Sequence, residues 1–158
     1  MTILLCPTWN GTKGGTLTIR NDVMRLFIYC SDPREEADLE TKINKTLLTP
    51  GEKIHRIAVY GGPIFLAHPI IFCDEANTML RQIDFAISEF HPEETVIVGH
   101  NCAFYKTKPS LATIGIHDKK QDISKIWKML MRRHPNQTFK SFFDISQGEQ
   151  VQFEHFAA

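Results

Sequence analysis

Residues 25–36 read RLFIYCSDPREE and join an apolar stretch to a strongly charged one. The run that ends at Cys30 is mostly apolar, as expected for a strand buried on both faces. Asp32 can cap a helix, and Pro33 suits the first helical position, with a glutamate placed to complete a capping box. The stretch therefore predicts a buried strand that ends at Cys30 and passes into a helix over residues 36–48.

The same change from strand to helix recurs along the chain. Further strands are expected at residues 55–60, 95–99, 138–145 and 151–156, and further helices at residues 74–90 and 123–133. Strands that alternate with helices imply a mainly parallel sheet with right-handed crossovers. We therefore expect an α/β fold in one domain spanning residues 1–158, with a mainly parallel central sheet of about four to five strands flanked by helices.

Length, charge and cysteine content limit the class of protein. The chain has 158 residues with 18 Lys plus Arg and 18 Asp plus Glu, so its net charge is zero with histidine neutral. That balance gives no reason to expect a nucleic-acid partner. Apolar runs are too short to cross a membrane or to form a secretory signal. Four cysteines do not suggest a disulfide framework in a chain of this size, so we expect thiols or metal ligands in the cytoplasm.

Two strand ends carry residues that can bind a metal. Cys30 ends one predicted strand, and His100 directly follows the strand at residues 95–99, with Cys102 two positions later. Ligands of parallel sheets bind beyond the carboxyl ends of the strands, so these residues are expected at one rim. Two cysteines and a histidine suit tetrahedral zinc with one position open. That position can hold water, or Asp32 can fill it.

Each of these residues also has a purely structural explanation. A cysteine that ends a buried strand often serves as a small hydrophobe, and Asp32 is sufficiently explained as a helix cap. Arg34 lies in a first helical turn, where arginine is usually solvated. The late helix has a basic side, interpreted as a solvated face: Lys119, Lys120, Lys125, Lys128, Arg132 and Arg133. The combination of C-x-D-x-R after one strand and H-x-C after another is what favours a functional site.

This combination resembles the β-class carbonic anhydrases. Their Cys-x-Asp-x-Arg signature stands here as CSDPR at residues 30–34. Their second signature is a strand followed by His-x-x-Cys, which VIVGHNC at residues 96–102 matches with one residue fewer. FKSFFDISQGEQVQF at residues 139–153 resembles the family's closing strand, glycine turn and strand. The resemblance covers roughly residues 22–155.

The resemblance implies a zinc enzyme that interconverts carbon dioxide and bicarbonate. Cys30, His100 and Cys102 would bind Zn²⁺, which lowers the pKa of its water to produce hydroxide. Asp32 would orient that hydroxide, and Arg34 would pair with Asp32. In some members the aspartate ligates zinc instead, so both roles of this residue stay open. The resemblance also implies a small-molecule substrate and a homodimer or higher homo-oligomer, without nucleic-acid or membrane partners.

Two other functions stay open. One is a zinc hydrolase that acts on a different small electrophile. The other is a non-catalytic carbonic-anhydrase-like binding or assembly protein, which the short spacing between His100 and Cys102 favours. One residue fewer in a strand shifts a side chain by about 3 Å, which exceeds the Zn–S bond length of about 2.3 Å. The sequence leaves the true substrate, oligomeric state and regulation undetermined.

Overall fold

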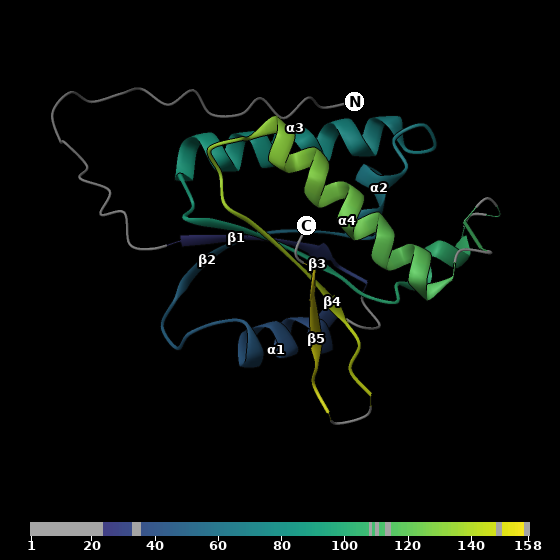
Figure 1. The fold of residues 1–158 in the computed structure, drawn as a ribbon, viewed down its shortest axis with the longest axis horizontal. Coiled ribbons are helices and arrows are strands. Elements are labelled where there is room, and N and C mark those ends of the chain that lie inside the picture. Colours follow the sequence, from purple (N-terminus) through teal and green to yellow (C-terminus); the bar gives the residue numbers. More distant parts are fainter. Residues whose placement is uncertain are drawn as a thin grey trace, which may run out of the picture.

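The structure, a computed structural model, describes residues 24–32, 36–107, 109, 111–112, 115–147 and 150–156 (Figure 1). The strands are β1 (Met24–Cys30), β2 (Lys53–Val59), β3 (Glu94–Gly99), β4 (Phe139–Asp144) and β5 (Phe153–Phe156). The helices are α1 (Glu36–Thr46), α2 (Ile64–Ala67), α3 (Cys73–Phe90), α4 (Ile116–Arg133) and the 3-10 helix η1 (Ala103–Thr107). Every helix in these ranges is too short or too polar to span a bilayer.

The sheet has five strands in the order β2-β1-β3-β4-β5. The pairs β1–β2, β1–β3 and β3–β4 are parallel, and β4–β5 is antiparallel. This arrangement confirms the predicted α/β fold with a mainly parallel central sheet. Because β1 and β3 are parallel neighbours, their carboxyl ends lie beside each other at one edge of the sheet.

Helices cover both faces of the sheet. Figure 1 shows α2, α3 and α4 on one side and α1 on the other. Alternate residues of a strand point to opposite faces, and the two apolar clusters divide β1 in this way. Leu26, Ile28 and Cys30 pack in the cluster that contains α3 and α4 residues. Phe27 packs with α1 in the second cluster. The alternation of side chains along β1 therefore places Cys30 on the face that α2, α3 and α4 cover.

Helix α4 begins earlier than the sequence predicts. Its first residue is Ile116, whereas the apolar stripe that predicted the helix starts at Ile123. The preceding turns contain Lys119 and Asp122, which are buried although they are polar. An apolar periodicity therefore does not detect this part of the helix. Helices α2 and η1 are also additional to the predicted elements.

The start of α1 is only partly described. The helix is present over Glu36–Thr46, close to the predicted residues 36–48. The predicted capping box depends on residues 33–35, which lie outside the described residues. The segment that follows β1 is therefore described up to Asp32, and it resumes at the first residue of α1.

Candidate metal centre

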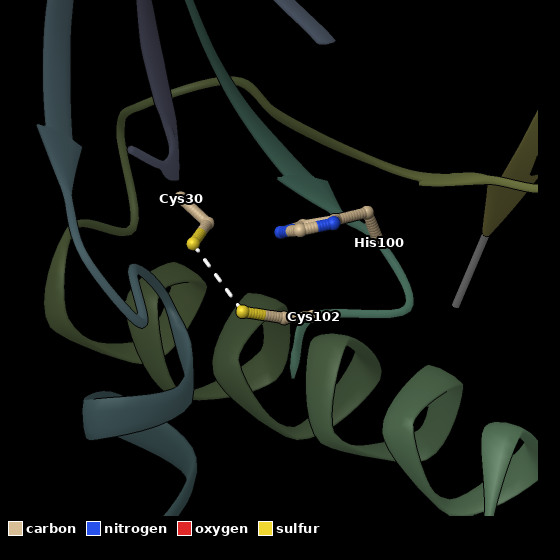
Figure 2. A group of neighbouring side chains, drawn as sticks. All are labelled: Cys30, His100 and Cys102. Atoms are coloured by element: carbon tan, nitrogen blue, oxygen red, sulfur yellow. Dashed lines mark hydrogen bonds between the residues drawn. The ribbon is translucent and has the colours of Figure 1, made fainter. Parts of the chain in front are cut away.

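Cys30, His100 and Cys102 meet at the carboxyl ends of β1 and β3. One ligand atom from each residue lies within 4.8 Å of the other two, and all three residues are buried. Figure 2 shows the three side chains directed into the same space between the two strand ends. The structure thus brings together the three residues that sequence reasoning considered as zinc ligands.

A glycine turn packs directly against Cys30. Gly61 and Gly62 follow β2 with φ values of +85° and +50°, a backbone region that favours glycine. A Cβ atom at Gly62 would lie 2.8 Å from both the Cα and the N atom of Cys30. The Gly61 backbone N–H also donates a hydrogen bond to Cys30 Sγ over 3.3 Å. The absence of side chains here lets the turn hold the thiol of Cys30 at close range.

A tight backbone turn brings Cys102 back toward His100. The Cys102 N–H donates to the His100 carbonyl oxygen over 2.7 Å, which closes a three-residue turn. The Phe104 N–H then donates to Cys102 Sγ over 3.4 Å, at the start of η1. In an extended chain each residue beyond His100 would lie about 3.3 Å further along the strand direction, so Cys102 would lie away from His100. The turn supplies the loop adjustment that a shortened His-x-Cys spacing needs.

The sulfur atoms of Cys30 and Cys102 lie within hydrogen-bond distance of each other. Cys30 Sγ and Cys102 Sγ lie 3.4 Å apart, and both residues are free cysteines. The hydrogen bond from Cys102 lowers the pKa of Cys30, His100 lowers it further, and burial acts in the opposite direction. The same contact and burial raise the pKa of Cys102. The close approach of the two sulfurs therefore favours ionisation of Cys30 and opposes ionisation of Cys102.

This donor set fits zinc. A cation that binds both sulfurs would displace the proton of this hydrogen bond, because thiolates rather than thiols are metal ligands. Two sulfurs bound to tetrahedral zinc at about 2.3 Å are about 3.8 Å apart, and the observed separation is 3.4 Å. Two soft thiolates and one imidazole are typical zinc ligands.

Asp32 is completely buried two residues beyond Cys30. The hydrogen bond that Cys102 donates to Cys30 and burial are the main causes that raise the pKa of Cys102, and the negative charge of Asp32 adds to them. Asp32 does not belong to the described group whose ligand atoms all lie within 4.8 Å of one another. Arg34, its expected partner, lies outside the described residues.

The space beside the three candidate ligands is small and mostly apolar. The cavity measures about 10 Å³, close to the smallest volume that holds one water molecule. Its walls include Ile64, Val98, Ile123 and Phe143. Gly99 lets α4 approach the end of β3, because a Cβ atom there would lie 2.5 Å from the Ile123 side chain. Bulk water therefore has little access to the sulfur atoms.

A buried carboxylate, Asp122, organises the helices around this cavity. It is hydrogen bonded to His68 Nε2 over 2.8 Å, to the Tyr105 hydroxyl over 3.1 Å and to Lys125 Nζ over 3.0 Å. Burial and the charge of Asp122 raise the pKa of Tyr105. Asp122 thus joins the residue that follows α2 to η1 and α4, and Tyr105 itself lines the cavity.

Lys119 is the main residue of the site that sequence reasoning missed. The expectation of a solvated basic face is wrong here, because this lysine is only 6% exposed and lines the cavity. Its Nζ atom donates to Asn101 Oδ1 over 2.7 Å and lies 4.7 Å from the Tyr105 ring centroid. Helical spacing could have indicated that Lys119 is buried. It is four residues before Ile123, so both residues lie on the same side of a helix.

Comparison with known proteins relates the fold to one class of enzyme. No protein-family model matches the sequence, and no curated protein matches it significantly. Among solved structures, it is similar to the β-carbonic anhydrase CafA of the fungal pathogen Aspergillus fumigatus, with a TM-score of 0.51 and 17% sequence identity. The match covers 89% of this chain and 78% of that chain. At this level of identity, the similarity establishes a relationship of fold.

Proposed function

We propose that this protein is a zinc enzyme that interconverts carbon dioxide and bicarbonate. The observation that carries the proposal is the convergence of Cys30, His100 and Cys102 within 4.8 Å at the carboxyl edge of the sheet. The overall fold is similar to that of a β-carbonic anhydrase. A soft three-residue donor set in this position supports a metal with one coordination position left for chemistry.

In this proposal Cys30, His100 and Cys102 would hold Zn²⁺ through two sulfur atoms and one ring nitrogen. When bound, zinc supplies Lewis-acid activation of water for attack on carbon dioxide. The two thiolates balance its charge, and the apolar walls keep other water away from the reacting atoms. The Gly61 and Phe104 backbone N–H groups donate to the two sulfurs and so fix their positions. Such supporting hydrogen bonds orient ligands and tune a metal site.

We assign Asp32 and Arg34 to the orientation of the attacking water. The Asp32 carboxylate is buried close enough to Cys102 to affect its pKa, where it can accept a hydrogen bond from that water. Arg34 would keep the carboxylate ionised through a charge-assisted hydrogen bond. The group of potential ligands consists of Cys30, His100 and Cys102 and does not include Asp32. This supports a role for Asp32 in orienting water rather than in binding the metal directly.

A second candidate is a carbonic-anhydrase-like protein whose metal has no catalytic role. The cavity volume of about 10 Å³ favours it, because little space beyond one water molecule adjoins the candidate ligands. This candidate predicts bound zinc without hydration of carbon dioxide. A zinc hydrolase for another small electrophile predicts bound zinc and turnover of that compound only.

Metal analysis and stopped-flow kinetics test the proposal. Protein purified without added zinc should contain about one zinc per chain and hydrate carbon dioxide in an acetazolamide-sensitive reaction. Cys30→Ser should lose both properties. Cys73→Ser is the matched control, because Cys73 is an exposed free cysteine at the start of α3. Full zinc content in the Cys30 variant would contradict the ligand assignment. Zinc without hydration in the unmodified protein would support the second candidate.

We also infer a homodimer or higher homo-oligomer acting in the cytoplasm, with the chain as one domain. The resemblance to β-class carbonic anhydrases supports the assembly. Free thiols at Cys30, Cys73 and Cys102 are compatible with a reducing compartment. Light scattering during size-exclusion chromatography measures the assembly directly. A mass equal to that of one chain would contradict the inference.

A further inference from the structure

The outer edge of β2 and the adjacent side of α3 form an open groove. In the described part of the chain, β2 is the last strand on one side of the sheet and pairs only with β1. Ile57 and Val59 of this strand face α3, because they pack in the apolar cluster that contains its residues. The edge of a sheet presents backbone donors and acceptors with which a further strand can pair. A strand added along this edge would therefore also lie beside α3.

A cavity occupies the carboxyl end of this groove. It measures about 330 Å³ and is mostly apolar, with Val59, Phe65 and Met79 among its walls. Asp74 and Glu75 also line it, and both are exposed residues in the first turn of α3. This end of the groove thus has room for additional chain and carries negative charge.

Two exposed aromatic residues of α3 flank the amino end of the groove. Phe90 stacks on His55 of β2 with ring centroids 4.7 Å apart, and the Phe85 and Phe90 centroids are 6.1 Å apart. Phe85 is 59% exposed and Phe90 is 38% exposed. Phe85 lies three residues beyond Gln82, which lines the cavity, so both lie on the same side of α3. Apolar side chains from an added strand would remove this aromatic surface from water.

We propose that residues 16–19 of the same chain occupy this groove as an added strand, antiparallel to β2. They lie outside the described residues and read TLTI, an alternation of polar and apolar residues typical of a strand with one buried face. Threonine and isoleucine also favour strands. With Leu17 opposite Ile57, both Leu17 and Ile19 would point toward α3, since directly opposite residues share a face of the sheet.

The length of the connection permits this placement. Met24 pairs with Lys53, so the chain enters β1 next to the first residue of β2. A strand on the outer side of β2 is two strand spacings, about 10 Å, from β1. Ile19 would also lie about 7 Å further along the strand direction, which gives a straight-line distance of about 12 Å. The five backbone steps from Ile19 to Met24 span up to about 17 Å, which is sufficient.

Charge favours this segment over a second copy of β2. In the proposed register Lys13 would lie beyond the carboxyl end of β2, where Asp74 and Glu75 line the cavity. By contrast, β2 contains Lys53 and Arg56 and no acidic residue. Antiparallel pairing of two copies of β2 would bring these basic side chains together, and like charges across a strand pair are destabilising.

Disulfide trapping in the full chain tests the placement. Thr18→Cys with Arg56→Cys introduces thiols at positions that would be directly opposite, with Cα atoms about 4.5–5.5 Å apart, a separation that suits a disulfide. The background carries Cys6→Ser and Cys73→Ser, so that the introduced thiols do not pair with these residues. Thr18→Cys with His155→Cys is the matched control, because His155 is an exposed residue of β5, at the opposite edge of the sheet.

Oxidised glutathione should convert the Thr18→Cys/Arg56→Cys protein to an internally cross-linked chain roughly tenfold or more faster than the control pair. The reason is that docking raises the effective concentration of the two thiols above that of thiols joined only by flexible chain. Alkylation of the remaining thiols followed by peptide mass spectrometry identifies the cross-link. Thr16→Cys with Ala58→Cys is a second pair in the same register, for use if the first does not fold.

Equal rates of cross-linking at the two edges would overturn the inference, as would failure of both β2 pairs to fold and cross-link. Cross-links between chains would place a second copy in the groove and would also overturn it. No step of the inference requires a metal, so these outcomes leave the proposed function unaffected.

Discussion

Replacing Gly62 with alanine should disturb both the fold and the metal site. The residue has φ of +50°, and a Cβ atom would lie 2.8 Å from the Cα and N atoms of Cys30. Contacts this short to backbone atoms are relieved only when the turn or the end of β1 moves. A displacement there shifts Cys30, so stability and metal affinity should fall together.

A second glycine separates the two causes of instability. Gly51 also has positive φ, +82°, but a Cβ atom there would have nothing within 4 Å. Gly51→Ala should therefore lose only the backbone component, about 1–2 kcal/mol. Gly62→Ala should lose that amount and a further 1–3 kcal/mol or so for overpacking, which gives a total of about 2–5 kcal/mol. The difference between the two variants measures the steric contact with Cys30.

Thermal unfolding and zinc competition provide the two measurements. At about 2–4 °C per kcal/mol for a chain of this size, Gly51→Ala should lower Tm by roughly 2–8 °C and Gly62→Ala by roughly 4–20 °C. Zinc affinity, measured against a chelating dye, should fall roughly tenfold to a hundredfold in the Gly62 variant only, as when a supporting residue is lost. Equal Tm values for the two variants, with zinc affinity unchanged in both, would refute the reasoning.

Three further predictions concern the buried network, an ion pair and the metal. Asp122→Asn removes the charge that three donors face, so we expect a loss of about 2 kcal/mol, seen as a Tm roughly 4–8 °C lower; an unchanged Tm would argue against a supporting role. The hydrogen bond from Arg133 lowers the pKa of Asp84. The hydrogen bond between Arg133 and Asp84 therefore stabilises the fold fully above the ordinary aspartate pKa of about 3.9, and this stabilisation is lost as the pH falls through the lower pKa of Asp84 in the folded protein. Arg133→Gln should consequently have a lower Tm than the unmodified protein near neutral pH and the same Tm in strong acid. A deficit that persists there would have another cause. Zinc at about 100 times its Kd should raise the stability of the metal-free protein by about 2.7 kcal/mol, or roughly 5–11 °C in Tm. Cys30→Ser should abolish that increase, and an equal increase in the variant would locate the zinc elsewhere.

Sequence reasoning was sufficient for the sheet and for the convergence of its strand ends. The strands β1 and β3 carry strong apolar runs, and parallel neighbours have their carboxyl ends at one edge. Cys30 and His100 were therefore placed near each other from the pattern alone. The structure adds the reason why a spacing of two residues also brings Cys102 close, namely the hydrogen bond from its N–H to the His100 carbonyl oxygen. A backbone turn of this kind has no sequence signature here.

The first turns of α4 illustrate what an apolar pattern misses. Lys119 and Asp122 are buried polar residues whose partners come from distant segments, including His68, Asn101 and Tyr105. Their burial depends on these tertiary contacts rather than on local hydrophobicity. Sequence periodicity consequently detects the apolar half of the helix and assigns the polar half to solvent.

The alternation of side chains along β1 makes the strand intolerant of small insertions and deletions. Leu26, Ile28 and Cys30 pack in one cluster, whereas Phe27 packs in the other. Loss of a single residue within the strand would exchange the two faces and direct the terminal thiol toward α1. Frame-preserving codon deletions in this segment should thus eliminate the metal centre even where the strand itself can re-form.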